Sequence, residues 1–420
     1  MSVKGFLRFL TAGLAVACAA APAFADAPVT ITVAYAYGKI FRPIHADIAK
    51  EFNKLHPEIK VDLQSPAANY EDLVQRTLAG LNQDGAPDIS FQAVNQIRQF
   101  VDAGQAMDLT PFTSADARWS APHGYYPSMM DLGKFGGRQM AIPFAISTPI
   151  LYYNADLFRK AGLDPERPPK TWPEVRAAAK NIQALGNEYG GIFYDYLISG
   201  NWGYQALLFS EGGAMMNADE TRVTFADAPG KRAARLLRGF VDDGSMKDWT
   251  RAQGEQSFIA GRVGFYVSTT AWLKGVQDKA RFDLRTALFP VGSTGLRSLP
   301  CGGNGAVIFT KDPKKAKAAY EYAMFAAGPV GTAIMVRNSG YMPQHEKGAE
   351  NLKDFYEANP DFKTSIQQIP AIAKWYSFPG RNTLKIIDVI KNSLQSVVAG
   401  RTKPDAAMDS AAAEVTALLH

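Results

Sequence analysis

The fold class is decided by residues 29–91, which begin with the alternating stretch Val29-Thr-Ile-Thr-Val-Ala34. Apolar residues at every second position predict a half-buried β-strand there. Residues 44–55 then carry apolar side chains at helical spacing, and residues 59–63 alternate again. A helical pattern over residues 70–81 and an apolar strand over residues 87–91 follow. This strand–helix–strand order predicts an α/β fold in which helices cover the sheets.

Length and charge narrow the class of protein. The chain has 420 residues, which is too many for one typical hydrophobic core and suits two large domains. Its 45 Lys and Arg residues nearly balance its 40 Asp and Glu residues, and the basic residues are scattered. Such a distribution offers no basic stripe for nucleic acid and no polybasic patch for a membrane surface. Because no Pro- or Ser-rich linker divides the chain, we expect connections that cross between two domains more than once.

Residues 1–25 predict a cleaved secretory signal peptide. Lys4 and Arg8 supply the positive flank, residues 9–23 form an uncharged, mostly apolar run, and Ala23-Phe-Ala25 supplies the cleavage site. The run is shorter than the roughly 18 residues that a membrane-spanning helix needs. We therefore expect an exported, periplasmic protein.

Cysteine usage fits export without disulfides. After cleavage only Cys301 remains, so no internal disulfide can form. A nucleophilic Cys301 would need a histidine and a third partner, and its position beside Gly302-Gly303 favours a small buried residue instead. Cys18, behind Leu14-Ala-Val-Ala17, leaves lipoprotein processing as the alternative to a fully soluble form.

The sequence lacks the motifs of common catalytic and metal sites. Its five histidines are isolated, and it contains no HExxH, GxSxG or GxxxxGK[ST] motif. The adjacent acids at 219–220 and 242–243 stand among polar residues, which favours solvated loops over a glycosidase pair. We therefore predict a non-enzymatic protein that uses no metal and no cofactor.

Ligand recognition is expected in loops that follow strand-like segments, because open α/β sheets bind ligands outside the carboxyl ends of their strands. Two facing lobes would place such loops on one shared cleft. The candidate loops share hydroxyl, amide, aromatic and glycine residues, which suit a sugar or polyol. These loops are residues 68–70, 92–96, 145–148, 200–204, 268–272, 302–305, 340–342 and 378–382.

One stretch is specific enough to indicate a family, and it reads Pro143-Phe-Ala-Ile-Ser-Thr-Pro-Ile-Leu-Tyr-Tyr-Asn154, with Pro169-Lys-Thr-Trp172 following. It resembles the periplasmic solute-binding proteins of ABC importers, in the sugar-binding group that includes maltose-binding protein, and is nearest to the glycerol-3-phosphate-binding group. Weaker signatures follow in the family's order at residues 258–265, 340–343 and 396–404. The resemblance implies the type II periplasmic-binding-protein fold, which is α/β with a ligand cleft between two lobes.

The resemblance also implies lobes that are discontinuous in sequence. Crossings between them are expected near residues 143–149, 301–303 and 340–342. The N-terminal lobe would then comprise residues 28–143 and 303–341, and the C-terminal lobe residues 144–302 and 342–420.

Pocket positions of the glycerol-3-phosphate-binding group are only partly matched. That group's pocket glutamate falls within Gln92-Ala-Val-Asn95, and its phosphate-side arginine falls within residues 384–387, where no arginine stands. Arg381 could supply a guanidinium from another direction, either to an anion or to neutral hydroxyls. With Thr269 in place of the group's serine, the predicted ligand-binding residues are Tyr70, Asn95, Ser147, Trp202, Tyr204, Thr269, Trp272, Gly303, Tyr341 and Arg381.

These patterns favour the substrate-binding component of an ABC importer. A monomeric two-lobed protein would close on a sugar, polyol or polyol phosphate and deliver it to the transmembrane subunits of a permease. The alternative is an exported carbohydrate-active enzyme, a lyase or glycosidase, which would need two buried carboxylates about 5 to 10 Å apart across the cleft. A polyamine or metal-ion binder would need acidic or metal-ligating residues in the cleft loops, which have almost none.

Overall fold

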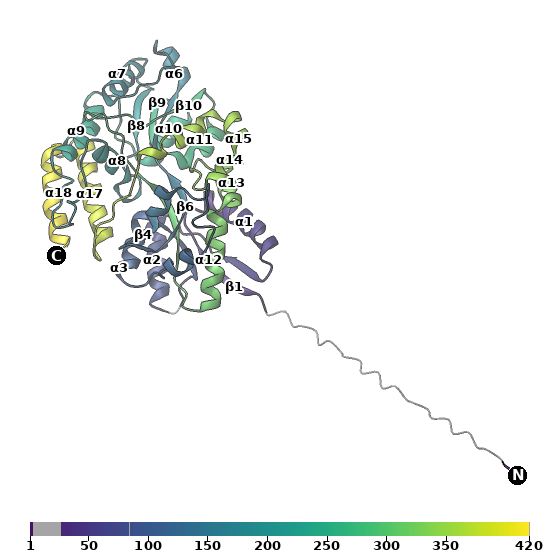
Figure 1. The fold of residues 1–420 in the computed structure, drawn as a ribbon. Coiled ribbons are helices and arrows are strands. Elements are labelled where there is room, and N and C mark those ends of the chain that lie inside the picture. The colour runs from purple at the N-terminus through teal and green to yellow at the C-terminus, as the bar shows by residue number, and fades with distance from the viewer. Residues whose placement is uncertain (3–26, 84, 420) are drawn as a thin grey trace.

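The computed structural model describes residues 1–2, 27–83 and 85–419. The last two ranges form two lobes, each built on its own sheet (Figure 1). The predicted cleavage site and Cys18 lie outside the described residues, as does nearly all of the predicted signal peptide. Among the described residues, no helix is both long enough and apolar enough to span a membrane.

The first lobe contains a five-stranded sheet in the order β2-β1-β3-β12-β6. Strand β1 pairs in parallel with β2 and β3, whereas β12 is antiparallel to both β3 and β6. The strands are β1 (Val29–Ala34), β2 (Ile59–Leu63), β3 (Ile89–Ala93), β6 (Ile142–Ser147) and β12 (Gly302–Ile308). Its helices are α1 (Gly38–Leu55), α2 (Tyr70–Leu81), α3 (Ile97–Asp102), α4 (Thr110–Ala115), α5 (Pro127–Met130), α12 (Pro313–Ala327) and α13 (Pro329–Arg337).

The second lobe contains a four-stranded sheet in the order β10-β7-β9-β8. Its strands are β7 (Pro149–Asn154), β8 (Gly190–Tyr194), β9 (Val263–Thr269) and β10 (Leu284–Ala287). Its helices are α6 (Ala155–Lys160), α7 (Trp172–Gln183), α8 (Trp202–Ser210), α9 (Ala228–Asp242), α10 (Arg251–Ile259), α11 (Leu273–Lys279), α14 (Glu346–Glu350), α15 (Lys353–Ala358), α16 (Lys363–Gln367), α17 (Thr383–Val398) and α18 (Pro404–Leu419). Helices α17 and α18 pack on α9 at one side of this lobe (Figure 1).

Three connections join the lobes. Strand β6 leads into β7 through Thr148, and the short strand β11 (Leu299–Pro300), which pairs with β13 (Ile372–Ala373), leads back into β12. The third follows α13, where the Met342 amide donates to the Ile146 carbonyl over 2.7 Å. Strand β6 stays in the first sheet as far as Ser147, past the boundary expected at residue 143.

The central strands of each sheet lie in the hydrophobic core of their lobe. Every residue of β3, β6, β7, β8, β9 and β12 is buried, as expected of strands covered on both faces. Cys301 is fully buried beside β12, and burial raises the pKa of its thiol, so the prediction of a small buried residue is confirmed.

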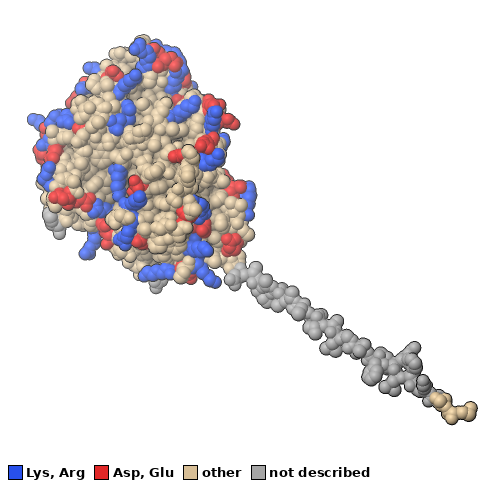
Figure 2. All heavy atoms as spheres, in the orientation of Figure 1, with Lys and Arg blue, Asp and Glu red and all other residues tan. Residues whose placement is uncertain are grey.

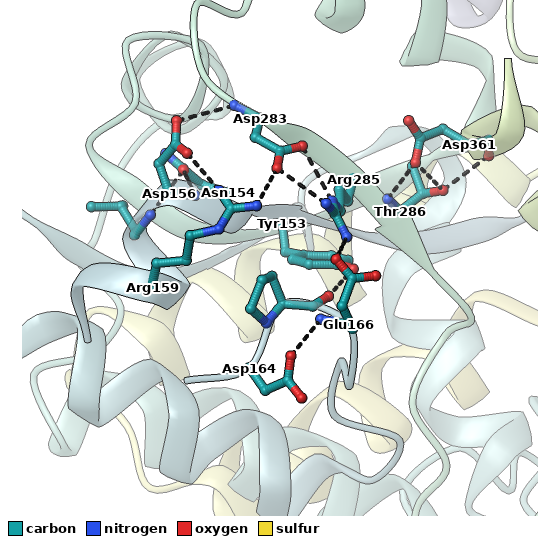
Figure 3. A network of polar contacts seen from close by, with 12 residues as sticks. Tyr153, Asn154, Asp156, Arg159, Asp164, Glu166, Asp283, Arg285, Thr286 and Asp361 are labelled. Carbon is teal, nitrogen blue, oxygen red and sulfur yellow. Dashed lines mark hydrogen bonds and ion pairs between the residues drawn. The ribbon is translucent and has the colours of Figure 1, made fainter. Parts of the chain in front are cut away.

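Polar side chains contact β10, the strand at one edge of the second sheet. In edge strand β10, the Thr286 amide donates to an Asp361 carboxylate oxygen over 2.9 Å (Figure 3). Beside it, Arg285 bridges Glu166 and Asp283, with an Nη1–Oε1 distance of 2.5 Å to Glu166. The Asp361 contact occupies a backbone amide that an unprotected edge strand would offer to another chain, and the Arg285 contacts place charged side chains on the same edge.

The visible surface carries basic and acidic residues side by side, separated by uncharged areas (Figure 2). The short strands β4 (Lys134–Phe135) and β5 (Arg138–Gln139) form a separate hairpin in the first lobe.

Candidate functional site

A pocket between the lobes gathers residues from both sheets. Water-sized groups have about 40 Å³ of room in it, within about 410 Å³ of empty space that extends to open solvent, so the two walls lie close together in this structure. It is lined by Tyr37, Tyr70, Ser147, Ile198, Ser199, Trp202, Arg251, Thr269, Ala271, Trp272, Gly302, Gly303, Tyr341 and Trp375.

Three tyrosines form the first-lobe wall. Tyr37 precedes α1 in a left-handed conformation with φ 51°, which is uncommon for a residue other than glycine and concentrates at functional sites. Its ring meets the edge of Tyr70 at 4.9 Å between centroids. The Tyr70 hydroxyl accepts a hydrogen bond from Asn304 over 3.0 Å, and the Tyr341 ring stacks on Phe41. Each ring is therefore held by neighbours within the first lobe.

Two glycines at the start of β12, Gly302 and Gly303, form the part of the pocket where the backbone packs most closely; this part is called the pocket floor. Gly303 has φ 106°, and a β-carbon there would lie 1.8 Å from the Ala145 carbonyl oxygen. A β-carbon at Gly302 would lie 2.8 Å from the Ser147 hydroxyl and 2.9 Å from the Trp202 ring. Both positions therefore require glycine.

The second-lobe wall consists mainly of tryptophans. Trp202 opens α8 and donates its indole N–H to the Pro300 carbonyl over 2.8 Å. Trp375 donates to the Gly200 carbonyl over 3.1 Å, and its ring centroid lies 6.3 Å from that of Trp202. The indole nitrogen of Trp272 is buried without a partner among the described residues. Large flat rings with few free polar atoms suit the C–H faces of a sugar or polyol.

The charged residue of the lining is Arg251, the first residue of α10. Its Nε donates to Asp195 over 2.9 Å, and its guanidinium carbon lies 5.3 Å from the Trp272 ring centroid. Asp195 is fully buried and also accepts from the Ser268 hydroxyl over 3.1 Å. Burial lowers the pKa of Arg251, but the charge and hydrogen bond of Asp195, together with Tyr266 and Tyr37, raise it above its usual range, so the guanidinium stays charged.

Seven of the ten predicted ligand-binding residues line this pocket. They are Tyr70, Ser147, Trp202, Thr269, Trp272, Gly303 and Tyr341.

Three predicted residues lie elsewhere. Tyr204 is fully buried in the second-lobe core, where its hydroxyl donates to the Phe225 carbonyl over 2.7 Å. It is two residues from Trp202 on one helix, so the two side chains point in nearly opposite directions. Arg381 is exposed in the turn before α17 and does not line the pocket. Asn95 is buried behind the wall, close to Gly200.

Sequence reasoning missed Arg251, Tyr37 and Trp375 as pocket residues. Tyr37 stands in an aromatic loop after the first strand, which is a signal that could have been used. Trp375 stands in an aromatic pair with Tyr376, a composition typical of core residues, and only its position shortly before residues 378–381 points toward the cleft. Arg251 follows Thr250, whose side chain forms a capping box with Gln253, but a helix cap does not show which way the first helical residue points.

Groups suited to acid–base or metal chemistry are not gathered in the pocket. Its lining contains no Asp, Glu, His or Cys, and the described residues contain no cluster of three metal-ligating side chains. The nearby acids are paired: Asp195 with Arg251, and Glu71 with the Ser199 hydroxyl of the opposite lobe.

Comparison with known proteins identifies the family. The model of the bacterial extracellular solute-binding protein family matches residues 47–364. The chain belongs to this family.

Individual relatives of this solute-binding protein are distant. A chain of Brucella abortus (strain 2308), described only as a binding protein, is 27% identical over the full length of both chains. The sn-glycerol-3-phosphate-binding periplasmic protein UgpB of Pectobacterium atrosepticum is 25% identical over 89% of this chain and 87% of its own.

The structure of UgpB from Mycobacterium tuberculosis in complex with glycerophosphocholine superimposes with a TM-score of 0.80 at 21% identity, covering 94% of this chain and 98% of that chain. The predicted α/β, two-lobed periplasmic-binding-protein fold is thereby confirmed.

Proposed function

We propose that this protein is the substrate-binding component of an ABC importer, that it works in the periplasm as a monomer, and that it captures a sugar, polyol or glycerol phosphate derivative between its lobes. The observation that carries the proposal is the pocket, in which aromatic rings of both lobes surround one charged anchor. A ligand that touches both walls stabilises the closed form, which is the form a permease would receive.

Arg251 is the proposed polar anchor of the solute. The Nε group of Arg251 donates a hydrogen bond to Asp195. No hydrogen bond from the two Nη groups of Arg251 to another described residue is seen. These groups form a planar fork that could bind two oxygens at once, from a phosphate or from neighbouring hydroxyls. The named ligands of the relatives, sn-glycerol 3-phosphate and glycerophosphocholine, contain both kinds of oxygen.

A carbohydrate-active enzyme is less well supported. Retaining and inverting glycosidases place two carboxyl groups across the scissile bond. Here the carboxylates nearest the pocket are engaged by Arg251, Ser268 and Ser199 rather than directed at a substrate.

The test is a thermal-shift and calorimetric comparison of residues 26–420 with glycerol, sn-glycerol 3-phosphate, glycerophosphocholine and maltose. A ligand at 100 times its dissociation constant should add about 2.7 kcal/mol of stability. Trp272→Ala should weaken binding of that ligand by about 1–3 kcal/mol through lost ring burial.

Two matched controls accompany the binding test. Trp249→Ala removes a tryptophan that packs on the same apolar cluster as Trp272 but lies outside the pocket, so it should leave binding unchanged. Arg251→Lys should weaken binding about tenfold or more, whereas Arg176→Lys, which alters another Asp-paired arginine outside the pocket, should not. If no compound of the panel stabilises the protein, or if both tryptophan variants bind equally, the proposal is contradicted.

A further inference from the structure

Outside the ligand pocket, a two-point arginine–carboxylate pair is among the contacts of the described residues that join the two lobes. Arg98 lies on α3 of the first lobe, and Glu220 lies in the α8–α9 connection of the second. The guanidinium contacts both carboxylate oxygens, with Nη1–Oε1 at 2.5 Å and Nη2–Oε2 at 2.6 Å. This two-point geometry is stronger and more directional than that of a single-point surface pair.

The surroundings of the pair indicate that its geometry is fixed. The two side chains are 23% and 30% exposed, so both are largely withdrawn from solvent. Glu220 has φ 57°, a left-handed conformation that costs free energy in a residue other than glycine. Hydrogen bonds from Arg98 hold the pKa of Glu220 below its usual range, so the pair stays charged at neutral pH.

A short strap, residues 374–377, connects this pair to the ligand pocket. Trp375 lines the pocket, and the next residue, Tyr376, donates its hydroxyl to Glu220 over 2.9 Å. The Ser377 carbonyl accepts from Arg98 over 3.3 Å. Lys374 donates to the Lys134 carbonyl of the first lobe over 3.1 Å. The strap therefore contacts the ligand site and the interlobe pair through adjacent residues.

We propose that the Arg98–Glu220 pair, buttressed by the strap, is a latch that keeps a fraction of the ligand-free protein closed. Opening the lobes breaks the pair and returns both charges to water. The latch adds a closing free energy that does not come from the solute, and apparent affinity rises in proportion to the closed fraction.

The latch can be tested without knowing the solute. Spin labels at Asn53→Cys and Asn181→Cys, exposed positions on α1 and α7, would report the interlobe distance by double electron–electron resonance. Buried Cys301 should not take up label. In the ligand-free protein we expect a short-distance population whose ratio to the long-distance one falls about three- to tenfold in Arg98→Ala and in Glu220→Gln. Raising salt to about 1 M should reproduce part of this shift.

The controls separate the latch from general effects of mutation. Arg235→Ala removes a two-point pair with Asp405 that lies wholly within the second lobe, so it should leave the distances unchanged. The charge-swapped double variant Arg98→Glu/Glu220→Arg should recover part of the short-distance population that each single reversal loses. Unchanged distances in Glu220→Gln, which preserves shape, would overturn the proposal, as would a wild-type protein found only at the long distance. Failure of the solute panel would not bear on this result.

Discussion

At the scale of single residues, burial determines what each charged or polar side chain can do. Arg251 remains charged inside the pocket because the fully buried Asp195 compensates the loss of water. The same pairing leaves one edge of the guanidinium for a ligand. Arg381, by contrast, is exposed on the surface, where a side chain of identical chemistry contributes nothing to the pocket.

His45 should make the protein sensitive to acid. It is fully buried among Tyr35, Phe91 and Phe144, and burial lowers its pKa to about 3. Because the unfolded chain binds the proton near pH 6.5 and the folded chain does not, stability is complete above that pH. It should fall by about 1.4 kcal/mol per pH unit between pH 6.5 and about 3.

The check is urea unfolding from pH 7 to pH 4. His45→Leu should lower the free energy of unfolding at pH 7 but flatten its decline toward acid. Replacing the exposed His123 by leucine should retain the wild-type decline. An unchanged acid slope in His45→Leu would assign the sensitivity to other groups.

At the scale of elements, the starts of helices and the edges of strands determine where the side chains of the second lobe lie. Thr171 caps α7 with a complete capping box to Glu174. Helix α8 begins after Asn201 in a left-handed conformation, and this turn directs Trp202 toward the cleft. On the outer edge of the second sheet, Asp361 accepts from the Thr286 amide of β10, the strand that pairs with β7 (Figure 3).

Removing the α7 cap should destabilise the second lobe without altering the pocket. Thr171→Ala should lower the free energy of unfolding by about 1 kcal/mol, since it leaves an amide of the first turn without its acceptor. Thr416→Ala, on the exposed face of α18, is the control and should be nearly neutral. Denaturant unfolding measures both; equal losses would show that the cap itself is unimportant.

At the scale of the whole molecule, the connections between the lobes include a position where the backbone leaves no room for a side chain. Gly303 lies where β12 leaves the crossing, and it combines a left-handed φ with contact against Ala145. Gly303→Ala should therefore cost more than about 2 kcal/mol, from strain and overpacking together.

Gly295→Ala is the matched control, because Gly295 also has a positive φ, 72°, but nothing within 4 Å of its β-carbon position. It should cost only about 1 kcal/mol. Thermal unfolding compares the two, and the spin-label distances show whether Gly303→Ala also alters closure. Similar costs would mean that the floor can shift to accommodate a methyl group.

Local pattern was enough to locate several elements, because a strand or helix with one buried face repeats its apolar residues at a characteristic period. The stretches 29–34, 59–63 and 70–81 were each predicted with the bounds that β1, β2 and α2 have. Loop composition and the family resemblance together predicted seven of the residues that line the pocket. Only the tertiary structure decided the rest: Tyr204 points into the core, and Arg251 supplies the guanidinium expected of Arg381. Arg98 meets Glu220 across the lobes. Which residues far apart in sequence meet depends on how two helix-covered sheets face each other, and no periodicity within one segment encodes that arrangement.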